Sequence, residues 1–284
     1  MPDFRDHFFG TVEEYSISTS NISNHLAQLS QVYLVSITTC SLSTMSTARH
    51  KIIHLVRHGQ ALHNVRAEPA RKAGCSFDDF LQLMREDDAV DAALTQEGIA
   101  QATRVQQQTS SAELQINPQL VVVSPLSRAI DTGIIVFGTQ DLPYICIESL
   151  RERSGMLLNG QRREVEYLRK KYPVINFDDI SPGSDAGWEK YGAEMLETKE
   201  ACARRAYESL LWIVKTRKET EVAIVAHGGL FHEMTNGIPE LIKCDQNTAE
   251  RFHNCELRTL KLHWNEDPAT AENLVLHLEK FTAP

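Results

Sequence analysis

The hydrophobic residues of this chain fall into short apolar runs that are separated by longer amphipathic segments. Four of these runs are too short for helices and are rich in valine and isoleucine, so they predict buried strands. These strands cover residues 51–56, 120–123, 144–147 and 222–226. Strands that alternate along a chain with helical segments are typical of a parallel sheet. We therefore predict an α/β fold with a mostly parallel central sheet.

The segments between the strands predict most of the helices. These helices cover residues 60–71 with an end near Gly74, 94–108 with Thr95 as the N-cap, a segment that ends near Phe137, and 190–217. Residues 74–93 are acidic and show no regular period, so we predict an irregular surface excursion there. Residues 257–264 and 273–279 alternate between apolar and polar, and we expect them to add edge strands to the sheet.

The N-terminal 48 residues differ in composition from the rest of the chain. They are rich in serine and threonine, and their apolar residues keep no helical or strand period. Their acidic residues argue against a mitochondrial presequence, which would be basic. We predict that residues 1–48 are an N-terminal tail, either disordered or an upstream extension of the gene model, and that one domain occupies 49–284.

Composition narrows the class of protein. The chain has 284 residues, 42% hydrophobic content and a formal net charge of -9, which is enough for one substantial core with an inserted cap. It offers no global basic field for nucleic acid or an anionic membrane, and no apolar run reaches the roughly 18 residues of a membrane span. The six cysteines form no CxxC pair, which favours free thiols in a reducing compartment. We expect a cytoplasmic protein, with the nucleus as a second compartment.

The first strand leads directly into Arg57, His58 and Gly59. A glycine after a strand allows a sharp turn that brings backbone N–H groups close to a ligand above the sheet edge. The guanidinium is a planar fork of donors that matches phosphate or carboxylate, and the imidazole can act as a nucleophile or a base. A helix N-terminus close to His58 also favours an anion, and Asn64 in the first turns of that helix can reach the same anion. This turn therefore predicts an anion site.

Two other strand ends carry matching groups. Arg128 lies in the first turn of the helix after the second strand, and His227 ends the fourth strand and precedes Gly228 and Gly229. Because the carboxyl ends of parallel strands lie at one edge of the sheet, Arg57 and Arg128 can face each other there. A solvated helix arginine and a structural histidine are the alternatives, but two strand-end His-Gly pairs in one chain favour a shared site. We include Gly228 among the substrate-binding residues.

The third strand leads to two candidate acids, Glu148 and Glu152. A carboxyl group set among apolar walls can keep its proton near neutral pH and donate it to a leaving oxygen. Either residue could equally be a surface carboxylate. The following insert, about residues 153–188, predicts a small cap in which Arg162 and Arg163 are candidates for contacts with the non-phosphate part of a substrate.

Metal and serine chemistry have less support in the sequence. A zinc site would need a third ligand at a suitable spacing, and His227 and His232 do not form an HExxH arrangement. No GxSxG elbow of a serine hydrolase is present. We predict a structural role for His54 and also for His63, which is expected on the wrong face of the following helix. We predict neither a metal nor an organic cofactor.

Five motifs occur along the chain in a fixed order, namely RHGQALHN, LTQEGIAQA, SPLSRAIDT, LRERSG and VAHGG. As a set they resemble the histidine phosphatase superfamily, in its phosphoglycerate mutase-like branch, and the resemblance covers about residues 51–234. It implies a three-layer α/β/α sandwich. Asp131 stands where relatives commonly have glutamine, a departure that concerns one helix face and not the chemistry.

The resemblance also implies roles within the site. The side chains that would bind the phosphate are Arg57, His58, Arg128 and His227. Of these, His58 would be the nucleophile that becomes phosphohistidine, while the other three stabilise charge on the phosphoryl oxygens. Glu152 would be the general acid, with Glu148 as the fallback. Asn64 falls on a position that often contacts the phosphate in this family.

Three functions are compatible with these residues. The preferred one is a phosphomonoesterase that hydrolyses a small phosphorylated metabolite, because Arg162 and Arg163 alone do not form a dense anion cradle in the insert. The alternative is a mutase of the phosphoglycerate mutase type, which returns the phosphoryl group to another hydroxyl of the same substrate. A phosphate-binding scaffold is the third, but a binding role does not need a nucleophile.

Overall fold

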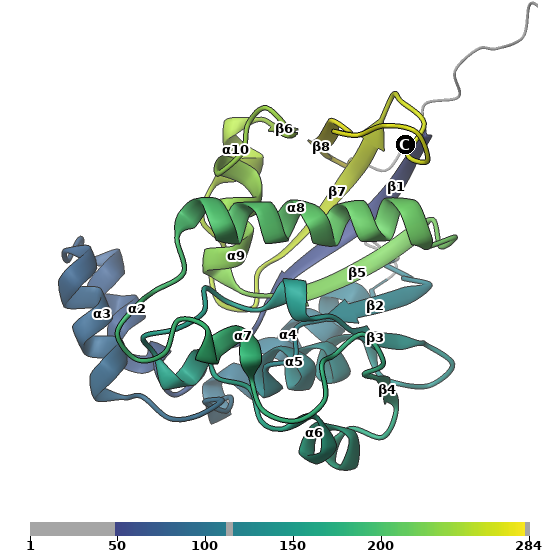
Figure 1. Cartoon of the computed structure of the whole chain (residues 1–284). Coiled ribbons are helices and arrows are strands. Elements are labelled where there is room, and N and C mark those ends of the chain that lie inside the picture. The colour runs from purple at the N-terminus through teal and green to yellow at the C-terminus, as the bar shows by residue number, and fades with distance from the viewer. Residues whose placement is uncertain (1–48, 112–115, 282–284) are drawn as a thin grey trace, which may run out of the picture. The chain divides into compact units, whose positions relative to one another are not determined.

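The computed structural model describes residues 49–111 and 116–281, so the predicted tail at 1–48 lies outside the described residues. The strands of these residues are β1 (Arg49–Arg57), β2 (Leu120–Val123), β3 (Tyr144–Cys146), β4 (Ile175–Asn176), β5 (Glu221–Ala226), β6 (Ile242–Cys244), β7 (Leu257–Trp264) and β8 (Leu276–Lys280). They form one sheet in the order β4-β3-β2-β5-β1-β7-β8-β6 (Figure 1). The predicted α/β fold is confirmed.

The sheet is mostly parallel, as predicted. β4, β3, β2, β5 and β1 run parallel to one another, β7 is antiparallel to β1 and β8, and β6 is parallel to β8. The prediction that the C-terminal segments are edge strands is wrong, because β7 and β8 lie inside the sheet. Their alternating pattern reflects burial of one face. The edges are β4 and β6, whose two and three residues are too few to show a period.

Helices cover both faces of this sheet. They are α2 (Asn64–Lys72), α3 (Phe77–Glu86), α4 (Gln96–Thr109), α5 (Ser127–Phe137), α6 (Val165–Lys171), α7 (Ala186–Glu189), α8 (Lys199–Thr216), α9 (Gly228–Asn236) and α10 (Gln246–Ala249), with short 3-10 turns η1 (Glu148–Leu150) and η2 (Leu158–Gly160). On one face, α8 and α9 pack on the sheet in the largest apolar cluster. On the other face, α5 and α6 pack in a second cluster (Figure 1).

Strand β2 shows why the core has two sides. Leu120 and Val122 belong to the cluster under α8 and α9, whereas Val121 and Val123 belong to the cluster under α5 and α6. All four side chains are fully buried, as expected for a strand covered on both faces. The predicted three-layer sandwich is therefore confirmed.

Two predicted segments differ from the structure. Residues 74–93 are not irregular throughout, because Phe77–Glu86 forms α3, whose N-cap Ser76 accepts a hydrogen bond from the backbone N–H of Asp79 at 3.1 Å. The apolar face of α3 lines a cavity and does not join the main core. The charged residues of this helix and its surroundings dominate the local composition. The helix predicted at 190–217 begins only at Lys199, where Thr198 is the N-cap.

Several smaller observations concern the predicted chain organisation. Part of the insert at 153–188 joins the sheet, because β4 pairs with β3. The cysteines of the described ranges are free thiols. Among the described residues, no helix is both long enough and apolar enough to cross a membrane.

Candidate active site

The register of β1 and β5 brings the two strand-end histidines together. Arg57 lies opposite Ala226 in this parallel pair, so His58 and His227 leave the sheet side by side. The centroids of their rings are 5.0 Å apart, and both side chains are buried. The structure therefore places the two predicted histidines at one point on the carboxyl edge of the sheet.

His58 is held as a neutral imidazole with one ring nitrogen available. Its Nδ1 atom lies 2.7 Å from the backbone oxygen of Gly59, and because a carbonyl can only accept, Nδ1 carries the proton. The other nitrogen, Nε2, is then unprotonated and accepts a hydrogen bond from Arg128 Nε at 3.3 Å. Burial, followed by the positive charges of Arg128 and Arg57, lowers the pKa of His58 well below its usual range. A neutral imidazole with an unprotonated Nε2 is the form that can attack phosphorus.

Arg128 lies directly beside the two histidines. Its Nε atom donates to His58 Nε2 at 3.3 Å, its Nη2 atom lies 3.4 Å from His227 Nδ1, and its Nη1 atom donates to the backbone oxygen of Asn159 at 2.6 Å. The side chain is fully buried, and within the described residues no carboxylate forms an ion pair with it. Burial lowers its pKa to about 10. A buried guanidinium without a carboxylate partner is suited to a bound anion.

The position of Arg128 is set by groups from other elements. At the start of α5 the carboxylate of Asp91 accepts hydrogen bonds from the Ser127 backbone N–H at 2.8 Å and from its hydroxyl at 2.6 Å. Asn159, whose oxygen accepts from Arg128, donates in turn from its own backbone N–H to Asp88 at 2.7 Å. These contacts fix the first turn of α5 against η2.

His227 and Arg57 are the other two predicted phosphate-binding residues. His227 Nε2 lies 2.7 Å from the hydroxyl oxygen of Ser124. Arg57 donates from Nη1 to the backbone oxygen of Phe252 at 2.8 Å and from Nη2 to Glu68 at 2.5 Å. Its Nε is buried without a hydrogen-bond partner, which leaves one donor for a ligand. A Cβ atom at Gly228 would lie 2.9 Å from this Nε, so the glycine keeps the guanidinium accessible.

Glu152 is held at the N-terminus of α9. Its carboxylate accepts hydrogen bonds from the backbone N–H groups of Gly229 at 3.1 Å, of Leu230 at 3.0 Å and of Arg153 at 3.0 Å. A side chain at Gly229 would displace this carboxylate from its present position. The exposed N–H groups of a helix start are natural partners for a carboxylate.

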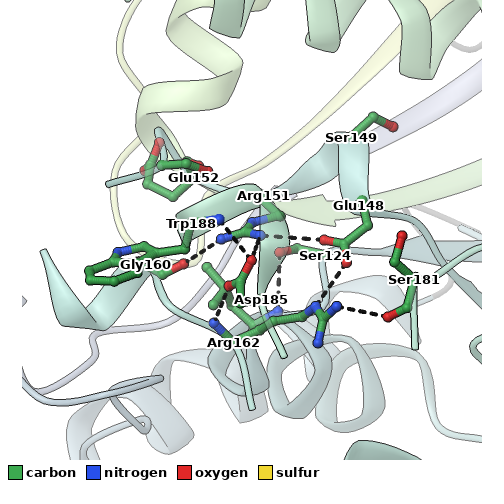
Figure 2. A network of polar contacts seen from close by, with 12 residues as sticks. Ser124, Glu148, Ser149, Arg151, Glu152, Gly160, Arg162, Ser181, Asp185 and Trp188 are labelled. Atoms are coloured by element: carbon green, nitrogen blue, oxygen red, sulfur yellow. Dashed lines mark hydrogen bonds and ion pairs between the residues drawn. The ribbon is translucent and has the colours of Figure 1, made fainter. Parts of the chain in front are cut away.

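The fallback acid Glu148 lies in a different environment, a buried polar network (Figure 2). Its carboxylate accepts a hydrogen bond from Arg162 Nε at 2.8 Å and lies 3.5 Å from Arg151 Nη1. Asp185 pairs with Arg151 and also accepts from the Arg162 backbone N–H at 2.7 Å. Glu152 lies outside this network. The network joins the insert to the segment that carries Glu152.

Arg162 and Arg163, the two arginines of the predicted cap, do not line the cavity that contains His58. The geometry therefore does not support the predicted contacts of these two residues with a substrate. The guanidinium of Arg162 donates to Glu148 and to four backbone oxygens of the insert, which makes it a structural group. Arg163 is exposed and donates to the backbone oxygen of Val90 at 3.1 Å. Asp131, the residue that departs from the family pattern, accepts a hydrogen bond from the Tyr172 hydroxyl at 2.8 Å.

Arg57, His58 and Glu152 line a cavity of about 410 Å³. The polar and charged residues that line it are Arg57, His58, His63, Asn64, Glu68, Arg71, Glu152, Arg153, Asn159, Lys199, Glu233 and Arg251, with Gly228 and Gly229. Arg128 and His227 are not among the lining residues, and both side chains are fully buried. Among the described residues, no group of three or more His, Cys, Asp or Glu side chains has the arrangement of a metal site.

Comparison with known proteins identifies the family to which this chain belongs. A sequence profile of the histidine phosphatase superfamily (branch 1) matches residues 53–275, most of the chain. The chain belongs to this superfamily. It is similar to a phosphoglycerate mutase-like protein of Arabidopsis thaliana, with 31% identity over 243 residues, 75% of this chain and 84% of the relative. Phosphoglycerate mutase-like protein 1 of the same plant is 32% identical over 242 residues, 75% of this chain and 81% of the relative.

A solved structure supports the same fold. The protein described as mycobacterial hydrolase 2 has a TM-score of 0.51 at 19% sequence identity, over 83% of this chain and 94% of its own. At this level of identity the likeness concerns the fold alone.

In this member of the histidine phosphatase superfamily, one cavity residue differs from the sequence prediction. His63 was expected to point away from the site, but its ring centroid lies 6.2 Å from that of His58 and the side chain lines the cavity. The reason is that α2 begins at Asn64, so His63 is its N-cap residue and not part of the predicted helix face. Its Nδ1 atom is buried and has no partner. A second histidine near the RHG turn was the available sequence signal.

The other predicted positions fit their expected surroundings. Asn64 lines the cavity, and its side-chain oxygen accepts a hydrogen bond from the backbone N–H of Ala61 at 3.0 Å. His54 lies away from the cavity, where its two ring nitrogens are 3.0 Å from the Thr259 hydroxyl and 2.9 Å from a Glu221 carboxylate oxygen. This contact pattern is that of a structural histidine.

Proposed function

We propose that this protein is a phosphomonoesterase that hydrolyses a small phosphorylated metabolite through a phosphohistidine at His58. The observation that carries the proposal is the neutral His58 ring, whose unprotonated Nε2 faces Arg128 at the inner end of the cavity. Neither a resident metal nor an organic cofactor enters the proposed reaction.

In the first step, His58 Nε2 attacks phosphorus while the bond to the ester oxygen breaks. Charge on the phosphoryl oxygens is stabilised by Arg57 Nε, by the guanidinium of Arg128 and by His227. The buried and otherwise unpartnered Nε of Arg57 supports this assignment, as does the absence of an ion pair at Arg128 among the described residues. The two arginine donors are in place before the substrate binds, so little reorganisation of them is needed.

In this proposal, Glu152 transfers the proton. Its carboxylic acid form protonates the departing alkoxide, and the resulting carboxylate then takes a proton from the water that attacks the phosphohistidine and releases His58. Its hydrogen bonds to the start of α9 keep the carboxylate at the cavity wall. Glu148 is the weaker candidate, because its carboxylate is bound within the network of Arg151 and Arg162.

We also assign His63 to the phosphate site. A buried imidazole without a protein partner is costly unless a ligand completes it. Burial, followed by the charges of Arg128 and Arg57, lowers the pKa of His63 well below its usual range, so the ring is neutral and can donate one hydrogen bond to a substrate oxygen. Asn64 and Gly228 line the same part of the cavity.

Hydrolysis is favoured over mutase activity by the outer part of the cavity. A bisphosphate intermediate needs a second dense set of cations, but Arg71 is already paired with Glu68 at 2.6 Å and Arg153 donates to the backbone oxygen of Glu197. Glu233 adds a negative charge to the same lining. A mutase remains the second candidate, because the Arabidopsis relatives are named phosphoglycerate mutase-like. A non-catalytic scaffold would have no use for the His58 arrangement.

The test is a panel of phosphorylated metabolites assayed in parallel for free phosphate and for isomerised product. Phosphate release without isomerisation is the expected result. Isomerisation without release would establish the mutase, and neither product from any member of the panel would contradict both enzymes. His58→Ala, which should keep the fold and lose all turnover, is the control for a contaminating phosphatase.

A further inference from the structure

The cavity extends from His58 to an apolar wall that the catalytic chemistry does not use. This wall is formed by one face of α3, with Phe77, Phe80, Leu81 and Met84. Leu157 and Leu196 also line the cavity. A phosphoryl group held at Arg57 and His58 would direct its ester oxygen and leaving group into this outer space, because the inner end is closed by buried side chains.

The α3 wall is separate from the main core. Met84 packs with Ala67 and Leu157 in a small cluster of its own, and Phe80 and Leu81 are only partly buried against it. Phe77 is 56% exposed, and its ring centroid lies 6.4 Å from that of Phe80. Apolar rings that remain hydrated inside a cavity gain from being covered by an apolar group.

Charges of both signs line the cavity near this wall. The carboxylates are Glu68, Glu152 and Glu233, and the basic residues are Arg71, Arg153, Lys199 and Arg251. The guanidinium of Arg71, besides its pairing with Glu68, lies over the Phe80 ring at 5.5 Å from the centroid. The feature that sets this wall apart is therefore its apolar surface.

We propose that the substrates of this site are phosphate monoesters of apolar alcohols whose hydrocarbon group is about the size of an aromatic ring. The phosphoryl group lies at His58, and the hydrocarbon group packs on Phe77 and Phe80. This inference rests on the phosphatase activity proposed above and specifies its leaving group.

The experiment compares 2-phenylethyl phosphate with propyl phosphate. Both are esters of primary alcohols, so the leaving oxygens are chemically matched and the comparison reports the hydrocarbon group. We expect kcat/KM for the phenylethyl ester to be higher by at least about tenfold, the order that pocket contacts of this size provide. Equal values, or a preference for glycerol phosphate over both, would overturn the inference.

Substitutions in α3 test whether the preference for the phenylethyl ester depends on this helix. Phe77→Ala and Phe80→Leu should lower kcat/KM for the phenylethyl ester more than for the propyl ester, since both remove ring contacts and the second keeps a similar volume. Tyr167→Ala is the matched control, because this aromatic side chain is 51% exposed on α6 and outside the cavity. An unchanged preference in both α3 variants would place the selectivity elsewhere and contradict the proposal.

A binding measurement separates this inference from the proposed function. The hydrolysis-resistant 2-phenylethylphosphonate and propylphosphonate are titrated into the wild-type protein by calorimetry. Tighter binding of the phenylethyl compound without release of phosphate from either ester would remove the phosphatase and keep the apolar subsite. Phosphate release from both esters with no difference in phosphonate affinity would remove the subsite and keep the phosphatase.

Discussion

The Nε atom of Arg128, a fully buried side chain, lies 3.3 Å from the Nε2 atom of His58, which lines the active-site cavity. Arg128 comes from the first turn of α5 and His58 from the end of β1. A cation aimed at the lone pair of the nucleophile keeps that nitrogen unprotonated. In the proposed reaction it would also stabilise charge on the phosphoryl oxygens.

Replacement of Arg128 tests this relationship. Arg128→Gln should lower kcat for an aryl phosphate by about 10²- to 10³-fold, the usual cost of losing one preorganised donor. Arg128→Lys should also lose activity, because an ammonium cannot supply the fork that reaches His58, His227 and Asn159 together. Arg169→Gln, a surface change at a side chain that is 47% exposed, should be neutral. Full activity of Arg128→Gln in a folded protein would refute the assignment.

Exchange of Glu152 should reveal the general acid through the leaving group. We expect Glu152→Gln to lower kcat by about 10²- to 10⁴-fold for an alkyl phosphate. For 4-nitrophenyl phosphate the loss should be much smaller, because that leaving group departs without protonation. Glu148→Gln weakens the ion pair with Arg162 and should affect stability without this dependence on the leaving group. The reverse pattern would move the acid to Glu148.

His63 offers a contrast between stability and binding. His63→Phe removes a buried imidazole that has no protein partner, so thermal stability should stay equal or rise. The inhibition constant of inorganic phosphate should rise by about tenfold, the loss of one hydrogen bond to a charged ligand. His54→Phe is the matched control, because both of its ring nitrogens are bonded. It should destabilise the protein by about 1–3 kcal/mol and leave phosphate inhibition unchanged.

If His63→Phe instead lowered the melting temperature and left phosphate inhibition unchanged, the imidazole would be a structural group. Both measurements are therefore made on the same preparations.

The buried histidines also predict how stability depends on pH. Burial is the largest cause that lowers the pKa of His58, His63 and His227 well below the ordinary value. Below about pH 6.5 the unfolded chain binds protons at these positions and the folded protein does not. Their contribution is therefore complete above pH 6.5 and is lost as the pH falls, by about 1.4 kcal/mol per pH unit for each histidine.

Urea unfolding at pH 7 and pH 5 measures this dependence. His63→Phe should show a smaller loss of unfolding free energy between these two values than the wild type, because one of the three titrating groups is absent. An equal loss in both proteins would show that His63 is protonated in the folded state.

The elements that carry the inner site follow closely from the sequence. Apolar runs of four to six residues next to Arg57, Arg128 and His227 specify strands whose ends meet, because parallel strands present their carboxyl ends at one edge. Local pattern and topology are enough to predict that these strand ends meet. Strand alternation does not separate His54 from His58, because the two are four residues apart; the contacts of His54 with Thr259 and Glu221 do.

Other features depend on contacts that local pattern does not contain. The sequence makes Arg162 a candidate for substrate contacts, but Glu148 and Asp185, which are distant in sequence, bind it in a polar network. The apolar residues of α3 have helical spacing, but the acidic residues around them obscure this helical period in the sequence. In the structure these apolar residues line a cavity. The predicted position of His63 depends on the residue at which the helix begins. Because α2 begins at Asn64 and not at residue 60, the His63 ring lines the cavity.

The most direct test of the account is to trap the covalent intermediate. Rapid acid-free quenching of enzyme with a radiolabelled phosphomonoester, followed by peptide mapping, should find one alkali-stable, acid-labile phosphate on the peptide that contains His58. His58→Gln should carry no label, whereas Glu152→Gln should still form it with an aryl phosphate. Label on another residue, or steady hydrolysis in His58→Gln, would contradict the central claim.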